Sequence, residues 1–397
     1  MKNLKTTYLL LLIFLAALSA TSVCQPTNIS WQKYSQIYGV DFFTDVIEDT
    51  NTGYTVAGAR KVKSKSLEYW ILRYNTNGDT IWTKTLGTEN KDIPKRIAQL
   101  GDKSYILVGS SEKENTNTPF LVKIDENGSE LWQKQFTIDE YLSVEDIVAL
   151  DEGNCVIVGG KGSDPANTKL WMAAMNGKGE IVWEKTFMDN LNGCIKSIKK
   201  LPVGGFALTG SVAEPGKNDC DILAFRTDEE GKEEWFSWIK TPGQKAWPAC
   251  ICCSPDSCFM VVGWKGKCLN DINSENPVFD FDMVLNKISC HGEILWTKGF
   301  DREGSEGGNG VTIRPDGNFI VAGIKATSFL GKVGPWLLHV DADGNELDEK
   351  LLQLHFNNDQ ASKVINTLDG GFVVIGPGIQ EEDNTRSDGW IMKFSSF

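Results

Sequence analysis

The chain has 397 residues and a formal net charge of −13 at neutral pH. An acidic chain is a poor candidate for nucleic-acid binding, because proteins that bind a phosphate backbone usually carry a basic face. Length alone suggests two or three domains, but internal repeats override such a count and indicate one repeat domain here.

The N-terminal segment, residues 1–22, is typical of a secretion signal. Two lysines precede Tyr8–Leu18, an apolar run of 11 residues, which is shorter than the roughly 20 residues of a spanning helix. Small residues permit cleavage after Ser22, or as far as position 24. A second interpretation is a lipid on Cys24, although the preceding valine fits that signal poorly. No later segment is apolar enough to span, so membrane contact would require that lipid.

Seven short apolar strands, each ending in a glycine, recur along the chain at intervals of 50 to 60 residues. These glycines are Gly58, Gly109, Gly159, Gly210, Gly263, Gly323 and Gly376. A β-branched residue stands twelve positions before each one: Val46, Ile97, Ile147, Ile198, Ile251, Val311 and Val364. The segments between them are rich in Gly, Asp and Pro, which favours a tight hairpin between a first and a second strand.

A third and a fourth strand complete each unit. The third strand often begins with an aromatic residue, as at Trp70 and Trp171, and a fourth-strand tryptophan follows twelve residues later, as at Trp82 and Trp183. The sixth unit has Asp348 at the tryptophan position. Four antiparallel strands repeated in this way are typical of a propeller blade, so the seven units predict seven blades.

The fourth-strand pattern also occurs before the first complete unit, around Trp31, whereas the last unit ends at Phe397 without it. We expect the segment at Trp31 to complete the last blade, because closing the ring removes exposed sheet edges. The predicted fold is an all-β, seven-bladed β-propeller of four-stranded antiparallel blades over residues 31–397. A linear solenoid would need polar capping repeats, and the sequence shows none.

The segment 121–132, Leu-Val-Lys-Ile-Asp-Glu-Asn-Gly-Ser-Glu-Leu-Trp, resembles the repeats of quinoprotein-like and WD40-like β-propellers. It is closer still to the tandem propeller repeats of exported bacterial surface proteins. The resemblance covers residues 31–397 and implies a fold, with little about activity. Quinone-dependent enzymes of that superfamily usually have eight blades, and this chain lacks their Thr-Gly-Lys before the tryptophan. Cys252 and Cys253 are similar to a cysteine pair near the cofactor in some of them, but they follow a predicted first-strand residue, Ile251.

Ten cysteines in an exported chain favour an oxidising compartment. Six fall in the fifth unit: Cys250, Cys252, Cys253, Cys258, Cys268 and Cys290. Local disulfides are expected there, because Cys-x-Cys-Cys spacing without a nearby histidine is a poor zinc signature.

No motif indicates catalysis, a metal or a cofactor. The three histidines, His291, His339 and His355, are far apart and have no metal-ligand spacing. A Gly-x-Ser-x-Gly elbow and a phosphate loop are absent. The acidic glycine turns, such as residues 341–344, offer fewer than the six to eight oxygens that calcium takes, so we interpret them as hairpin turns.

The fifth unit departs from the repeat. Ten of the 13 tryptophans occupy blade-packing positions, and Trp238, Trp247 and Trp264 do not. Trp247 is expected just before the first strand and Trp264 just after the second, so both should lie close together on one face. From Gly263 to the aligned third-strand position there are 21 residues, against 11 to 14 in the other units. Long loops in compact folds are often functional.

This insertion, residues 265–281, predicts a ligand-binding patch. Trp247, Trp264 and Phe279 would provide stacking surface for a sugar ring, and Asp271 and Asp280 would provide hydrogen bonds. The alternative is that these rings only hold the insertion against the blade.

The sequence favours a non-enzymatic scaffold that binds a protein or glycan on one face. It would be exported, either periplasmic, on the cell surface or secreted. One alternative is a propeller enzyme, either a quinone-dependent oxidoreductase or a glycan-cleaving hydrolase or lyase. Another is a structural envelope protein held by a lipid at Cys24.

Overall fold

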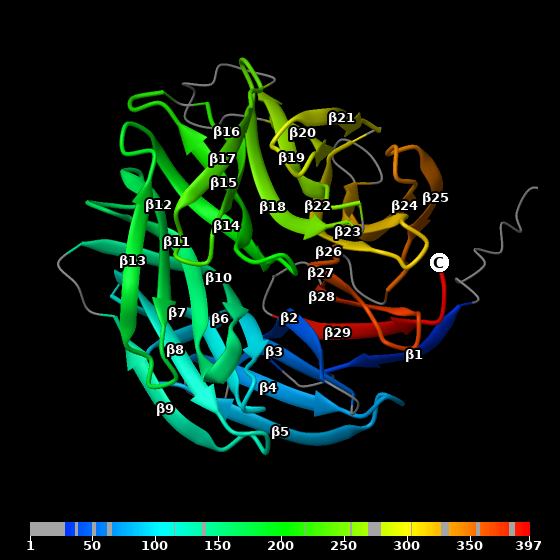
Figure 1. The fold of residues 1–397 in the computed structure, drawn as a ribbon. Helices are drawn as coiled ribbons and strands as arrows, with labels where there is room; N and C mark the ends of the chain where they lie inside the picture. The colour runs from blue at the N-terminus through cyan, green and yellow to red at the C-terminus, as the bar shows by residue number, and fades with distance from the viewer. Residues whose placement is uncertain are drawn as a thin grey trace, which may run out of the picture.

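The computed structural model forms seven antiparallel sheets around a central axis (Figure 1). It describes residues 28–35, 39–49, 53–61, 66–114, 116–136, 140–217, 219–254, 256–268, 279–302, 304–326, 333–354, 358–380 and 386–397. The predicted seven-bladed β-propeller is therefore confirmed. The predicted signal segment, Cys24, Asp271 and His355 lie outside the described residues.

Blades one to four each contain four consecutive strands. Blade one comprises β2 (Asp41–Asp49), β3 (Gly53–Lys61), β4 (Leu67–Tyr74) and β5 (Thr80–Leu86). Blade two comprises β6 (Lys91–Gln99), β7 (Tyr105–Lys113), β8 (Thr116–Ile124) and β9 (Glu130–Gln135). Blade three comprises β10 (Tyr141–Ala149), the short 3-10 helix η1 (Asp151–Gly153), β11 (Cys155–Gly162), β12 (Thr168–Met175) and β13 (Ile181–Phe187). Blade four comprises β14 (Asn192–Lys200), β15 (Phe206–Ala213), β16 (Asp221–Thr227) and β17 (Glu233–Ile239).

Blades five and six follow the same plan, and blade seven closes the ring. Blade five comprises β18 (Lys245–Cys253), β19 (Phe259–Cys268), β20 (Phe279–Ile288) and β21 (Ile294–Phe300). Blade six comprises β22 (Glu306–Ile313), β23 (Phe319–Ala326), β24 (Val333–Val340) and β25 (Glu346–Leu351). Blade seven comprises β26 (Asn358–Asp359), β27 (Lys363–Asn366), β28 (Phe372–Gln380), β29 (Arg386–Phe394) and β1 (Ile29–Tyr34).

The N-terminal strand completes the last blade, as predicted. β1 pairs antiparallel with β29, with Trp31 opposite Lys393 and Tyr34 opposite Trp390. Figure 1 shows the blue β1 beside the red β29. Because strands from the two ends of the chain share one sheet, blade seven is complete only when both are present.

Each fourth-strand tryptophan packs on a turn glycine of the next blade. The pairs are Trp31–Gly78, Trp82–Gly128, Trp132–Gly179, Trp183–Gly231, Trp235–Gly292 and Trp296–Gly344. A Cβ on Gly344 would lie 2.6 Å from the Trp296 ring, and its φ of +74° also favours glycine. Asp348 in blade six has no such turn to cover, because the third and fourth strands of blade seven are not joined by one. This explains the missing tryptophan of the sixth unit.

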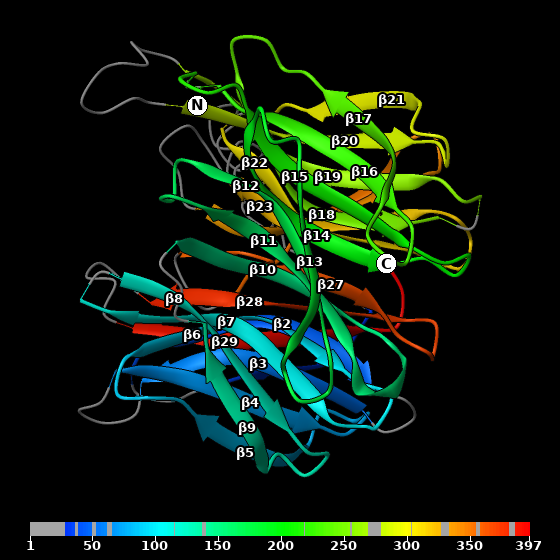
Figure 2. The same ribbon diagram turned by 60° about the vertical axis from the view of Figure 1, so that its left-hand side comes forward.

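Apolar cores lie between neighbouring sheets. For example, Leu170 and Met172 of blade three are buried against Ile195 and Leu208 of blade four. The strands run between two faces of the ring, as the turned view shows (Figure 2). We call the face where first strands begin the loop face, and the face where they end the hairpin face. Within the described residues, no helix has the length and apolar character needed to cross a membrane.

Candidate functional site

A β-bulge occurs at the same place in the first strand of blades one to six. In blade three, for example, the pairing with β11 skips one residue between Val144 and Asp146. A Cβ on Gly159 would stand 1.9 Å from the carbonyl oxygen of Ser143 beside this bulge. Close backbone approach at the bulge therefore explains why each second strand carries a glycine at this position.

The bulged residues of blades one to six and Ser362, the equivalent position of blade seven, form a ring around the axis near the loop face. They stand fourteen positions before each glycine, and they are Thr44, Lys95, Glu145, Lys196, Ala249, Asn309 and Ser362. Together with neighbours that include Arg96 and Gln360, they line a central cavity of about 430 Å³. We call this cavity the loop-face funnel.

Glu145 lies between two lysines in this funnel. Its carboxylate oxygens are 2.8 Å from Lys95 Nζ and 3.5 Å from Lys196 Nζ. Burial alone would raise the pKa of Glu145, but the two lysine charges hold it below its ordinary value. Burial lowers the pKa of Lys196, yet the Glu145 carboxylate raises it on balance. Glu145 and Lys196 are therefore both charged at neutral pH, and two lysines surround a single carboxylate.

In each first strand, the residue directly after the ring position lies deeper in the channel. We call this second ring of residues the polar waist. Its charged members are Lys363, Asp45, Arg96 and Asp146, from blades seven, one, two and three. Lys363 Nζ lies 3.2 Å from Asp45 Oδ1, and Arg96 Nε lies 3.6 Å from Asp146 Oδ1. Asp45 and Asp146 also accept the backbone N–H groups of Ile97 and Ile198, each at 3.0 Å. These interactions link blades seven, one, two, three and four.

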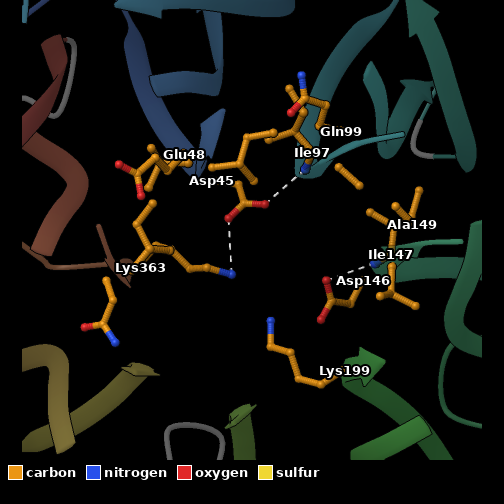
Figure 3. Close-up of a pocket in the computed structure, with 15 residues that line it drawn as sticks. Asp45, Glu48, Ile97, Gln99, Asp146, Ile147, Ala149, Lys199 and Lys363 are labelled. Carbon is orange, nitrogen blue, oxygen red and sulfur yellow. Dashed lines mark hydrogen bonds and ion pairs between the residues drawn. The ribbon is translucent and has the colours of Figure 1, made fainter. Parts of the chain in front are cut away.

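A second cavity, the hairpin-face funnel, opens at the far ends of the first strands and has a volume of about 520 Å³. Figure 3 shows Asp45, Asp146, Lys363 and Lys199 around its centre. The two funnels have no lining residue in common.

The predicted patch of blade five lies in paired strands. Trp247 of β18 and Trp264 of β19 are directly opposite each other. Each of their rings has its centroid 5.9 Å from that of Phe281. The predicted proximity of the two indoles is confirmed, but their placement outside the strands was wrong. Strand pairing continues past the second-strand glycine in blade five, as it does in the other blades.

Trp264 packs against blade six. Its indole Nε1 donates to the carbonyl of Gly308 at 3.1 Å, and a Cβ on Gly307 would lie 2.4 Å from the ring. Trp247 is half-buried, as is Asp280, whose Oδ1 has no hydrogen-bond partner among the described residues. The side chain of Phe279 lies outside the described residues, as does Asp271. The binding role of this patch stays a prediction.

The expected disulfides of blade five do not form among the described cysteines. Eight cysteines are free thiols: Cys155, Cys194, Cys220, Cys250, Cys252, Cys253, Cys258 and Cys290. Cys250 and Cys252 are two residues apart along one extended strand, roughly 6.7 Å between Cα atoms, which is the upper limit for a disulfide. Cys253 points to the other face of that strand. Burial raises the pKa of the Cys253 thiol to about 11, so the thiol stays protonated at neutral pH. The side chain of Cys268 lies outside the described residues.

The charged channel residues were missed by the sequence argument. The repeat offered a signal for them. Each stands two positions before a β-branched first-strand residue, as Lys95, Glu145 and Lys196 do before Ile97, Ile147 and Ile198. What the register alone did not show is the bulge that turns them to the axis. In the described part of the chain, no group of three or more His, Cys, Asp or Glu side chains could hold a metal ion.

No known protein family matches the chain, and neither does any curated protein sequence. Solved β-propellers match it over most of its length. The WD40 domain of Pan2 from Neurospora crassa aligns with a TM-score of 0.54 at 10% identity, over 90% of this chain and 89% of that one. The polysaccharide lyase Uly1 aligns with a TM-score of 0.56 at 10% identity, over 96% and 95% of the two chains.

An ulvan lyase of family PL25, solved with a bound GlcA–Rha3S saccharide, aligns with a TM-score of 0.59 at 8% identity. The match covers 92% of this chain and 96% of that one. Identities this low show the fold alone. The protein is a seven-bladed β-propeller whose structural neighbours include a WD40 domain and propeller enzymes.

Proposed function

We propose that this protein is a scaffold that binds an acidic glycan in the loop-face funnel. The observation that carries the proposal is the placement of Lys95 and Lys196 around Glu145 at the mouth of the channel. The chain as a whole is acidic, with a net charge of −13, whereas this cavity carries positive charge in excess. A carboxylate or sulfate on a sugar could take hydrogen bonds from both ammonium groups.

The polar residues of the ring suit the rest of a sugar. Thr44, Asn309, Gln360 and Ser362 line the same funnel, and hydroxyl and amide groups hydrogen-bond readily to sugar hydroxyls. Charge-assisted hydrogen bonds contribute about 1.5–3 kcal/mol each. The acidic group would therefore provide most of the affinity and the neutral groups most of the orientation.

The aromatic group of blade five would extend this surface. Pro248 and Ala249, which follow Trp247 on β18, line the funnel. A glycan that leaves the funnel toward blade five would therefore meet Trp247. Asp271, Asp280 and Phe279 remain the further contacts that the sequence predicts for it. Trp264 would support this surface from below, because its indole is already fixed on Gly308.

A non-enzymatic role is supported by the state of the funnel carboxylate. Glu145 is held ionised by two lysines, so it is poorly suited to donate a proton, and its lowered pKa also makes it a weak base for proton abstraction. Structural neighbours nevertheless include polysaccharide lyases, so glycan cleavage by this fold is the competing function. The same saccharide assay separates the two, since a scaffold returns its ligand unchanged and an enzyme does not.

The test is isothermal titration calorimetry with hexuronate and sulfated disaccharides, with neutral cellobiose as the ligand control. Binding of the acidic saccharides should weaken about tenfold or more in a Lys95→Met, Lys196→Met double variant. It should be unchanged in Lys91→Met, whose side chain pairs with Glu112 outside the funnel. Equal binding by the double variant, or by cellobiose, would overturn the proposal. Chromatography of the recovered saccharide tests cleavage.

Two matched variants test the blade-five extension. Trp247→Ala should weaken the binding of longer acidic oligosaccharides more than that of disaccharides. Trp264→Ala should lower stability as well, because its indole packs against blade six. If neither variant changes binding to a glycan and protein panel, the patch is not part of the site.

We also propose that the chain is exported, on the basis of the positive and apolar character of residues 1–22. Mass spectrometry of the mature protein would find an N-terminus at residue 23 to 25 after export. An unmodified start at Met1 would overturn this proposal. A mass increase from acyl chains on Cys24 would identify the lipid-anchored form.

A further inference from the structure

The hairpin-face funnel contains a cation that is not used by the fold. Lys199 extends from β14 toward the centre of the cavity (Figure 3). None of the described residues forms a hydrogen bond or ion pair with the Lys199 ammonium group. The preceding and following lysines in the sequence, Lys196 and Lys200, both form ion pairs. An ammonium group that lines a cavity and has no protein partner attracts an anion from the solvent.

The other charges at the floor of this funnel are balanced. Lys363 pairs with Asp45, and Arg96 pairs with Asp146 from the far side of the waist. Lys199 therefore leaves one positive charge in excess at the floor. Burial lowers the pKa of Lys199, but the negative charges around it, among them those of Asp146 and Asp45, raise it on balance, so the ammonium stays charged at neutral pH.

The wall above this floor is apolar on four neighbouring blades. The position directly after the β-branched residue is Ile365, Ile47, Ala98 and Val148 in blades seven, one, two and three, and all four line the cavity. In blade four, the same position is Lys199. One cation thus faces an aliphatic wall, an arrangement that matches a molecule with an anionic head and an apolar body.

The rim limits the charge of that molecule. Glu48 stands on the rim of the funnel, where it accepts the backbone N–H of Leu368 at 2.8 Å. With Asp45 and Asp146 at the floor, a second negative charge on the ligand would meet carboxylates instead of free donors. A monoanion avoids this repulsion.

We propose that the hairpin-face funnel is a second binding site, which takes a small amphipathic monoanion with its carboxylate on Lys199 and its apolar body against Ile47, Val148 and Ile365. The site shares no lining residue with the loop-face funnel, and the charged waist lies between them. It therefore does not depend on whether the loop face binds a glycan.

The probe is octanoate, followed by isothermal titration calorimetry, with octylamine and 1-octanol as ligands of the same chain length but different charge. The site predicts one molecule of octanoate per chain and clearly weaker binding of the other two. Lys199→Met should weaken octanoate binding about tenfold or more. The adjacent Lys200→Met is the matched control and should change it less than twofold, because Lys200 is exposed and pairs with Asp151.

A second variant guards against loss of folding in Lys199→Met. Val148→Phe fills the aliphatic wall without removing a charge, and it should also abolish octanoate binding while the circular dichroism spectrum is retained. Octanoate binding that survives both substitutions would overturn the proposal. Equal binding of octylamine, or no binding of octanoate by the unmodified protein, would overturn it as well.

Discussion

Replacing Trp31 with alanine should open the ring at its closing blade. The Trp31 indole lies on Gly78 of blade one, and its Nε1 donates to the carbonyl of Thr76 at 2.9 Å. Its ring centroid is 5.7 Å from that of Tyr54 and 6.4 Å from that of Tyr74. This one side chain therefore joins the N-terminal strand of blade seven to blade one.

The size of the effect follows from these contacts. A tryptophan buries about 150–250 Å² in a core. Because Trp31 is half-buried, its replacement by alanine removes about 100 Å² of buried area. At about 25 cal/mol per Å² this area corresponds to about 2.5 kcal/mol. The hydrogen bond and the aromatic contacts add to that figure. We expect Trp31→Ala to lower the free energy of unfolding by about 3 kcal/mol.

Urea denaturation followed by tryptophan fluorescence measures this loss, and limited proteolysis shows where the ring opens. Trp132→Ala is the matched control, because Trp132 makes the same contact with Gly179 and donates to the carbonyl of Gly177 at 3.2 Å. Both variants should lose similar stability, but only Trp31→Ala should release the N-terminal strand to protease early. A loss below about 1 kcal/mol, or the same proteolytic pattern in both variants, would refute the reasoning.

Three further predictions concern the bulge, the buried carboxyls and the funnel. Gly159→Ala should destabilise strongly, because a Cβ there meets a backbone carbonyl at 1.9 Å, whereas Gly101→Ala should be close to neutral, with its nearest atom at 3.8 Å; chemical denaturation of both variants checks this. Burial raises the pKa of Glu306 and of Asp359 to about 7, so the folded state holds protons that the unfolded state releases near pH 4. The free energy of unfolding should therefore fall as pH rises from about 4 to 7, and Glu306→Gln with Asp359→Asn should flatten this slope in urea titrations at several pH values; a slope that is unchanged contradicts the assignment. Glu145→Gln should strengthen the binding of acidic disaccharides several-fold while lowering stability, and weaker binding in calorimetry would argue against the role of the two lysines.

The ring could be predicted from the sequence because the same residue types recur at constant spacing in each unit. The constant step from a β-branched residue to Gly159 and its equivalents fixed the strand pairing, and the tryptophan at position 31 identified the closing strand. The reason for the glycine could not be predicted, since it depends on a bulge in the neighbouring strand. The same applies to Asp348. It replaces the tryptophan of the other units because no turn joins the third and fourth strands of blade seven.

The candidate site was harder to predict because its residues belong to different units. Lys95, Glu145 and Lys196 are about 50 residues apart in sequence, and only the ring brings them together at the axis. Each looks like an ordinary polar residue of an alternating strand. The disulfide prediction failed for a related reason, since the count of cysteines in blade five carries no information on which faces of the strand they occupy.

A structure of the protein with a bound hexuronate oligosaccharide tests the central claim most directly. The account predicts the sugar in the loop-face funnel, with its carboxylate in hydrogen-bond contact with Lys95 and Lys196. A saccharide bound elsewhere on the ring, or an empty funnel at saturating concentration, would contradict it.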